Sequence, residues 1–509
     1  MHRSPPSPSG VHERHLAVSA AVQQISQAVA VLSMLAAITV LARRLPLPEF
    51  GTYGLLVSLT TYLVFVQGSV ETAAVKAIAE AGDQQARDRA FSTAASLYAG
   101  AGLVAGAVIA LAGSALLTLF DIPVGLRHEA QTSVLVLAAI TAAGWPLKVF
   151  QDVLRGSQRF ALAALADVVA YLGIGSLLVV LAFEAAPLWV LVGVGASIPV
   201  ATGAVSVILV RHARLSCTFR RQAVSLASVR GFLGLSGYLF FIGIADLVIY
   251  SLDRAILATF RSAATVGLYE GPIRAHNLVR QVNGTLSIPV VPAAARYLAT
   301  GDTMRTRELF LRGTRYTVAA VVPLTIVLMV LAKPILHVWL GARFETAATG
   351  MTVLLAYWLV NANTGVAAGM LVAAGRARQL TLYAAVVAGL NLVLSLALTP
   401  SFGLVGVVLG TTVSYVVLFP FFLAIALPTF SVSLADLARE AWLPGYTTGL
   451  VVGVGLILVR LSAHLDNLPK VVVAAALGLL AYWIIYYTVW LRPSERALVR
   501  NVALALVRR

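Results

Sequence analysis

Long apolar runs recur along almost the whole chain. A helix needs about 20 mostly apolar residues to cross a bilayer, where no water is present to bond the backbone. About fourteen such segments can be marked off, and only 11% of the residues are charged while 59% are hydrophobic. We therefore expect an all-α polytopic membrane protein with about 14 transmembrane helices.

The expected spans alternate with short polar loops. They cover roughly residues 18–42, 52–78, 91–119, 131–155, 160–183, 187–210, 232–259, 265–295, 313–333, 347–372, 379–399, 403–427, 443–461 and 470–491. Lys and Arg number 26 in the two tails and the even-numbered loops, against 7 in the odd-numbered loops. Because basic loops stay in the cytoplasm, both termini are expected to be cytoplasmic. The net charge of +16 is spread over these loops, so we expect no nucleic-acid partner.

Three short fragments recur in the same order further along the chain. Gly51-Thr52-Tyr53 is echoed by Gly267-Leu268-Tyr269, Gly156 by Gly375, and Gly193 by Gly406, at spacings of 213 to 219 residues. A repeat of this length holds six spans, and an even number keeps both copies in the same orientation. The expected fold therefore has two six-helix lobes in a parallel pseudo-twofold repeat, plus two C-terminal helices.

This repeat predicts five parts of the chain. They are a cytoplasmic tail (1–17), an N-terminal six-helix lobe (18–225), a C-terminal six-helix lobe (226–428), helices 13 and 14 (429–491) and a basic amphipathic segment (492–509). The last part carries arginines among Leu and Val, which is typical of a helix lying on a membrane surface.

Charged and polar residues interrupt the seventh and eighth expected spans. An ionisable side chain inside a spanning helix costs roughly 2.5–3.5 kcal/mol, so it usually faces water or a partner. Asp246 and Asp253 share one face of the seventh span, and Arg254 lies beside Asp253. Two polar stripes follow the eighth span; one comprises Glu270, Arg274, Asn277, Gln281 and Gly284, and the other His276, Arg280, Asn283 and Ser287. This helix is expected to line a wet cavity.

The first lobe carries fewer such residues. Gln24 and Gln27 lie in the first span and Glu71 in the second. Asp167 in the fifth span lies at a depth where it can pair with Lys148. We interpret the amides as sugar contacts, and helix–helix hydrogen bonds are the alternative.

Each charged candidate also has a purely structural interpretation. These alternatives are an Arg280 bridge to Asp246 or Asp253, extension of Arg254 to the membrane interface, a helix-stabilising Glu270–Arg274 pair, and a buried polar contact of His276.

Common enzyme motifs are missing from the chain. It has no G-x-x-x-x-G-K-[ST], H-E-x-x-H or G-x-S-x-G sequence. The single cysteine, Cys217, excludes an intrachain disulfide framework and a Cys-x-x-Cys metal site. We expect a transporter that is not an enzyme and that needs no cofactor or metal.

Three stretches carry a family resemblance: LARRLPLPEFGTYGLLVSL (41–59), DLVIYSLDRAILATFRSAATVGLYEGPIRAHNLV (246–279) and AAGRARQLTLYAAVVAGLNLVLSLALTPSFGLVGVVLGTTVSY (373–415). They resemble polysaccharide flippases of the Wzx type, in the multidrug/oligosaccharidyl-lipid/polysaccharide (MOP) exporter superfamily. The resemblance implies transport of polyprenyl-diphosphate-linked oligosaccharide units across the bacterial cytoplasmic membrane, for O-antigen, lipopolysaccharide or exopolysaccharide biosynthesis. It implies alternating access between the lobes, with membrane lipid and polysaccharide polymerase or assembly proteins as partners.

The resemblance also assigns roles to the candidate residues. Arg280, Arg274 and Arg254 would bind the diphosphate, because arginine forms strong bidentate bonds to phosphate. The polar contacts would come from His276, Asn277, Gln281, Asn283, Gln24 and Gln27. Asp246, Asp253, Glu270 and Glu71 would balance charge or couple an ion.

Four other functions stay open at this point, one of them a peptide or lipid-only scramblase. Relatives that flip the peptidoglycan precursor tend to carry several cavity arginines in the first lobe, whereas the first two spans here offer glutamines. A cation-coupled drug antiporter of the same superfamily would need a carboxylate-dominated cavity, whereas the eighth span is net basic. A membrane scaffold for polysaccharide assembly would have no use for a polar stripe in mid-membrane.

Overall fold

The computed structural model describes residues 8–61, 64–224, 252–287, 290–497 and 500. These residues form α-helices joined by short turns, with no strand among them. The chain divides into two compact units, Met1–Gly267 and Leu268–Arg509. The predicted lobe boundary at residue 225 borders 225–251, which lies outside the described residues, so the predicted division into parts stays a prediction.

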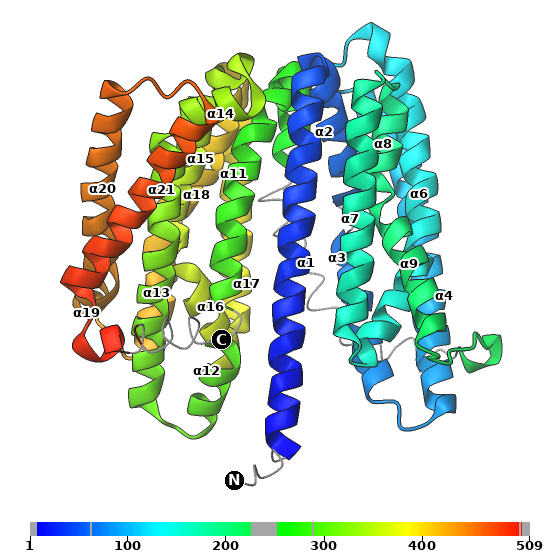
Figure 1. Ribbon diagram of the computed structural model, residues 1–509, viewed down its shortest axis with the longest axis horizontal. Helices are drawn as coiled ribbons and strands as arrows, with labels where there is room; N and C mark the ends of the chain where they lie inside the picture. The colour runs from blue at the N-terminus through cyan, green and yellow to red at the C-terminus, as the bar shows by residue number, and fades with distance from the viewer. Residues whose placement is uncertain (1–7, 62–63, 225–251, 288–289, 498–499, 501–509) are drawn as a thin grey trace, which may run out of the picture. The chain divides into compact units, whose positions relative to one another are not determined.

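The first unit is a bundle of long helices (Figure 1). Its elements are α1 (Pro8–Arg44), α2 (Leu47–Thr61), α3 (Val64–Ala79), α4 (Gln84–Val108), the π-helical turn η1 (Ile109–Gly113), α5 (Ser114–Leu117), α6 (Val124–Gly156), α7 (Phe160–Phe183), α8 (Leu188–Ala196), α9 (Ile198–His212) and the 3₁₀ turn η2 (Arg221–Ala223). Helix α6 packs against α3, α4, α8 and α9, and α1 packs along α7. Helix α1 begins at Pro8, inside the stretch predicted to be a tail.

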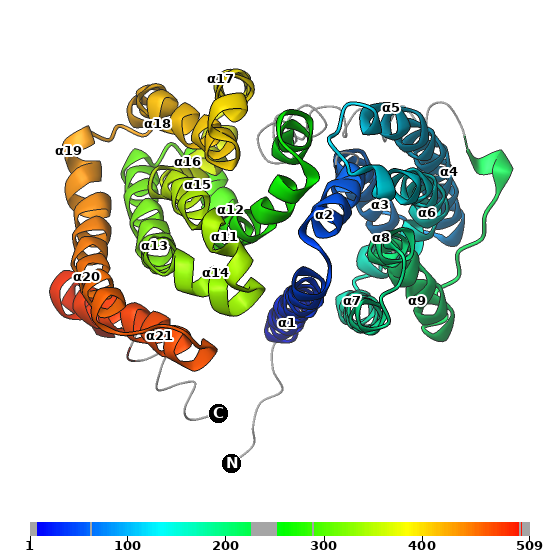
Figure 2. The same ribbon diagram turned by 90° about the horizontal axis from the view of Figure 1, so that it is seen from above.

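The second unit is also a helix bundle. Its elements are α11 (Ala263–Ser287, whose first residues belong to the first unit), α12 (Val290–Ala299), α13 (Thr303–Val330), α14 (Ala332–Leu340), η3 (Ala342–Ala347), α15 (Ala348–Asn361), α16 (Thr364–Ala373), α17 (Ala377–Phe402), α18 (Leu404–Thr429), α19 (Leu434–Leu437), η4 (Ala438–Trp442), α20 (Leu443–Ser462), α21 (Leu468–Ile485) and η5 (Tyr486–Trp490). Within this unit, α20 and α21 lie along one side, next to α13 and α14 (Figure 2).

Many of these helices are long and apolar enough to cross a membrane. Nine qualify within the described residues, or eleven if each of two bent pairs is one span. The bent pairs are α8–α9 and the segment from η3 through α15 to α16, each with a bend of 43°. The all-helical polytopic fold is confirmed, whereas the count of fourteen stays a prediction. Helix α13 begins at Thr303, before residue 313 where the ninth span is expected to begin, so the basic stretch between the eighth and ninth spans is partly helical.

Small residues let α17 and α18 approach closely. A Cβ on Gly406 would lie 2.4 Å from the carbonyl oxygen of Leu398, and one on Gly410 would lie 2.3 Å from Ser395 Oγ. Backbone cannot yield as a flexible side chain can, so only glycine fits at position 406.

We predict that Gly406→Ala destabilises the second unit by about 1–3 kcal/mol, because the added methyl group forces the two backbones apart. Gly389→Ala on α17 is the matched control, because a Cβ there meets no atom within 4 Å. This control should be neutral or slightly stabilising. Thermal unfolding in detergent measures both, and equal unfolding temperatures would contradict the prediction.

A buried carboxylate fixes the segment that follows α9. Asp88 on α4 is 1% exposed, accepts hydrogen bonds from the Thr218 backbone N–H (3.1 Å) and hydroxyl, and pairs with Arg220 (3.2 Å). Gln84 donates to both Asp88 (2.8 Å) and the Ser216 carbonyl (2.9 Å). Residues 216–220 are thereby held against α4.

Cys217 lies in this segment and is half-buried. Burial raises the pKa of the Cys217 thiol to about 11. Only the thiolate is nucleophilic, so alkylation should be slow at pH 8 and accelerate roughly tenfold per pH unit up to about pH 11. Asp88→Asn should speed the reaction at pH 8, because it loosens the segment. Iodoacetamide labelling followed by intact-mass measurement tests this prediction. If Cys217 of the folded protein is alkylated at pH 8 as fast as in denaturant, the prediction is refuted.

Candidate functional site

An ion network lies on one face of α6 in the first unit. Lys148, Gln151, Asp152 and Arg155 follow one another at i, i+3, i+4 and i+7, so they share this face. They occupy the last turns of the helix, which ends at Gly156. Three neighbouring helices add partners to this face: α3, α4 and α7.

The two cations of the network are bridged by carboxylates from other helices. Glu71 of α3 accepts from Lys148 Nζ at 3.1 Å and also contacts Arg155. Asp167 of α7 lies 3.6 Å from Arg155 and accepts from Gln151 at 2.7 Å. The predicted Asp167–Lys148 pair is replaced by these contacts, because Lys148 lies about two turns before Arg155 on α6 and meets Glu71 and Asp152 instead.

Asp152 is the most deeply buried member of the network. It is fully shielded from solvent, accepts from the Tyr98 hydroxyl of α4 at 2.6 Å and lies 3.4 Å from Lys148. Close packing of α4 on α6 brings Tyr98 here, since a Cβ on Gly102 would lie 2.9 Å from Trp145 Cβ. A carboxylate removed from water needs such partners.

The network carries more negative than positive formal charge. Lys148 and Arg155 contribute two positive charges, and Glu71, Asp152 and Asp167 contribute three negative ones. The side chains of Glu71, Arg155 and Asp167 are between 21% and 26% exposed, so solvent reaches this side of the cluster. Asp152 lies on the opposite, fully buried side. Such an arrangement favours a cation or a proton rather than an anion.

The polar stripe of the eighth expected span lies on α11. Arg274 pairs with Glu270 at 3.0 Å, as the i,i+4 interpretation predicts, and Glu270 is 1% exposed. Asn277, Gln281 and Gly284 continue this stripe and are exposed. Arg280 is half-buried on the neighbouring stripe. Helix α11 thus presents a continuous polar edge.

The second stripe of α11 faces the interior of its unit. His276 is 1% exposed, and Trp358 Nε1 of α15 donates to its Nδ1 at 3.1 Å. The His276 ring also packs 5.3 Å from the ring of Tyr357. Asn283 is buried beside Gly365 of α16. These placements favour the interpretation of His276 as a buried polar contact.

The remaining predicted residues are placed as follows. Gln24 and Gln27 are exposed on α1, while Ser26 between them donates to the Ala164 carbonyl of α7. Asp253 is buried and Arg254 half-buried in the helical segment 252–260. Asp246 lies outside the described residues.

The network on α6 was not predicted as a site. The signal was present, because four polar residues at helical spacing in an apolar span mark a buried polar face. Spacing along one helix does not show which other helices meet this face, so it does not predict that Glu71 and Asp167 join the same network.

The family of the chain follows from comparison of its sequence with known protein families. The model for polysaccharide biosynthesis proteins matches residues 40–349, well over half of the chain. The chain belongs to this polysaccharide biosynthesis protein family. No curated protein matches the chain.

Solved structures share the fold of this family member. The lipid II flippase MurJ, in an inward closed conformation, has a TM-score of 0.74 at 13% identity, covering 94% of this chain and 99% of that one. An inward-facing multidrug resistance MATE family transporter of the MOP superfamily has a TM-score of 0.64 at 14% identity, covering 79% and 96%. A MOP superfamily transporter from Pyrococcus furiosus, described as having a binding pocket of reverse polarity, has a TM-score of 0.52 at 13% identity, covering 81% and 95%.

These comparisons confirm several predictions from the sequence. The chain belongs to the matched family, its many apolar helices make it a multi-pass membrane protein, and its fold is that of MOP superfamily transporters, in agreement with the predicted superfamily and with the prediction that it is not an enzyme. They also agree with the resemblance to the Wzx type.

Proposed function

We propose that this protein flips polyprenyl-diphosphate-linked oligosaccharide units across the bacterial cytoplasmic membrane for surface or extracellular polysaccharide biosynthesis. The observation that carries the proposal is the family match over residues 40–349. Transport would proceed by alternating access between the two lobes, with both termini in the cytoplasm. Polysaccharide polymerase or assembly proteins would take up the product.

The two polar stripes of α11 support this proposal chemically. A diphosphate needs cationic donors, which Arg274 and Arg280 would supply, with Arg254 as a further candidate. The exposed Asn277 and Gln281 would contact sugar hydroxyls, as would Gln24 and Gln27 on α1. Glu270 already holds Arg274 at 3.0 Å, so an incoming phosphate would exchange with this carboxylate.

The ion network would serve charge balance or ion coupling. Glu71 was assigned this role from the sequence, and the network adds Asp152 and Asp167 to it. With three carboxylates against two cations, uptake of one proton or monovalent cation would neutralise the cluster. Asp246 and Asp253 would be further candidates for the same role.

Lipid-linked intermediates provide the decisive test. A deletion strain should accumulate complete polyprenyl-diphosphate-linked repeat units and lose surface polysaccharide, and the intact gene should reverse both effects. Mass spectrometry of lipid extracts measures the accumulated units. An unchanged pool of these units would refute the proposal.

A second candidate is flipping of the lipid-linked peptidoglycan precursor. The likeness to MurJ favours it, because that likeness spans 94% of this chain whereas the MATE likeness spans 79%. At 13% identity, however, the likeness shows the fold alone. The same extracts separate the candidates, because accumulation of the peptidoglycan precursor instead of oligosaccharide units would favour the second.

A further inference from the structure

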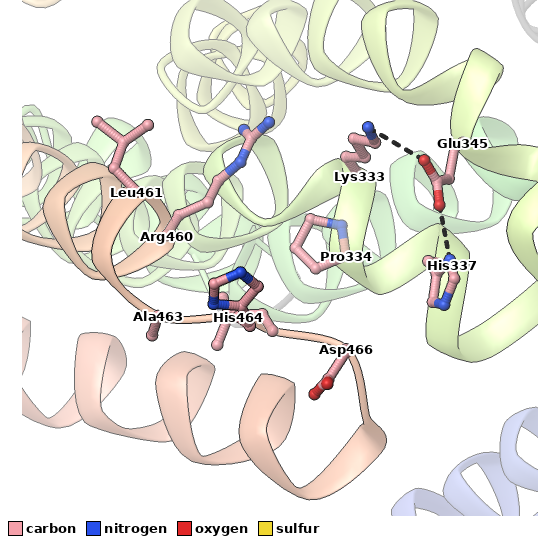
Figure 3. Close-up of a pocket in the computed structure, with 10 residues that line it drawn as sticks. Lys333, Pro334, His337, Glu345, Arg460, Leu461, Ala463, His464 and Asp466 are labelled. Carbon is pink, nitrogen blue, oxygen red and sulfur yellow. Dashed lines mark hydrogen bonds and ion pairs between the residues drawn. The ribbon is translucent and has the colours of Figure 1, made fainter.

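A small cavity lies at the end of the second unit where α20 turns into α21. Its volume is about 350 Å³. Its walls come from three segments: the start of α14, the η3 turn, and the end of α20 with its following loop (Figure 3). The polar lining residues are Lys333, His337, Glu345, Arg460, His464 and Asp466. A cavity of this size is at the small end of ligand sites, large enough for a headgroup but not for a chain of sugars.

The carboxylates of the cavity are already neutralised by neighbouring cations. Glu345 lies 3.1 Å from Lys333 Nζ and 2.6 Å from His337 Nδ1. Asp466 lies 2.8 Å from Lys470 Nζ and is 63% exposed, and the Lys470 pair lowers the pKa of its carboxyl group. Neither acid is left to compensate the remaining basic residues.

Arg460 is the basic residue of the cavity that no acid compensates, and His464 lies on the same wall. Arg460 Nη1 donates to the carbonyl of Val330 at 2.9 Å, a neutral acceptor. Within the described part of the chain, no carboxylate lies within ion-pair distance of Arg460, and the His464 ring makes no hydrogen bond. Figure 3 shows both side chains on the wall opposite Lys333, His337 and Glu345. A guanidinium held at one nitrogen still offers donors to an anion.

The cavity borders a surface that faces lipid. Exposed apolar side chains continue along both helices next to it, among them Leu458, Leu461, Leu468 and Val472, of which Leu461 is 79% exposed. Apolar surface of this extent on spanning helices is covered by acyl chains. The cavity therefore lies where those helices end, at the level of lipid headgroups.

We propose that this cavity binds the phosphate group of an anionic membrane lipid. Arg460 would bind the phosphate and His464 would add a second donor, while Pro334 and Leu461 contact the glycerol backbone. The ligand would hold the α20–α21 pair against α14. The site is separate from the polar residues assigned to transport, so the proposal stands independently of the transported substrate.

Native mass spectrometry of the delipidated full chain in detergent tests this. The probe is phosphatidylglycerol, and inorganic phosphate is added in a parallel titration. The wild type should retain one phosphatidylglycerol that R460Q/H464Q binds at least about tenfold more weakly. Arg460→Lys should fall between them, because it keeps the charge but loses the bidentate geometry. Arg376→Gln, an exposed arginine elsewhere on the same unit, is the control and should match the wild type.

Two outcomes would overturn the proposal. One is equal phosphatidylglycerol retention by R460Q/H464Q and the wild type. The other is that inorganic phosphate binds with the Arg460 dependence while phosphatidylglycerol does not, which would make the ligand a soluble anion. Misfolding does not confound either result, because Arg460 and His464 are exposed and thermal unfolding of each variant is measured alongside.

Discussion

Lys148→Met is expected to lower the stability of the first unit by about 3–5 kcal/mol. Lys148 is the cation next to the fully buried Asp152, and its Nζ also bridges to Glu71 at 3.1 Å. Without it, Asp152 keeps the Tyr98 hydroxyl but loses its nearest positive charge. A buried carboxylate without compensation is costly, so thermal unfolding in detergent should shift down by roughly 10 °C.

Two further variants make this prediction specific. Lys76→Met removes an exposed lysine 3.9 Å from Glu80, and such surface pairs contribute about 0–1 kcal/mol. The double variant Lys148→Met, Asp152→Leu removes both buried charges and should recover much of the loss, because well-packed apolar residues can replace a buried ion pair. If the single variant behaves like Lys76→Met, or if the double variant is less stable than the single one, Asp152 does not depend on Lys148.

The sequence predicted the large features of this molecule well. Helical class and membrane residence follow from apolar runs of about 20 residues, which admit few other folds. The Glu270–Arg274 pair was predicted because an i,i+4 spacing fixes a contact without knowledge of the tertiary fold. Three local stretches predict a polysaccharide flippase family, and the match to the polysaccharide biosynthesis family agrees with that prediction.

Contacts between helices were the part that could not be predicted. Asp167 was expected to pair with Lys148, yet it meets Arg155 and Gln151, because the rotation of α7 relative to α6 decides which turn it faces. Likewise, the periodicity of α11 placed His276 on a polar stripe, but only tertiary packing puts Trp358 against it. Hydropathy fixes which residues lie in the membrane, whereas helix rotation depends on close approaches such as Gly102 on Trp145.

Arg280→Ala is expected to lower the rate of substrate flipping at least about tenfold while leaving insertion intact. Arg280 lies four residues after His276 on the second polar stripe of α11, where His276 is held in the aromatic interior and Arg280 itself is half-buried. This arrangement fixes the helix face on which Arg280 projects. A hydrogen bond between a charged group and phosphate contributes about 1.5–3 kcal/mol, so losing one arginine should reduce transport by one to two orders of magnitude.

The measurement is the pool of lipid-linked oligosaccharide in a deletion strain carrying each variant at matched membrane abundance. Arg296→Ala, which changes an exposed arginine on α12, should restore the wild-type pool because Arg296 lies outside both polar stripes of α11. Arg280→Lys should restore transport in part, since it keeps the charge without the bidentate fork. A normal pool in the Arg280→Ala strain would remove Arg280 from the substrate path. Arg274 would then be the next candidate for binding the diphosphate. Glu270→Gln would test whether Arg274 leaves Glu270 to bind the phosphate.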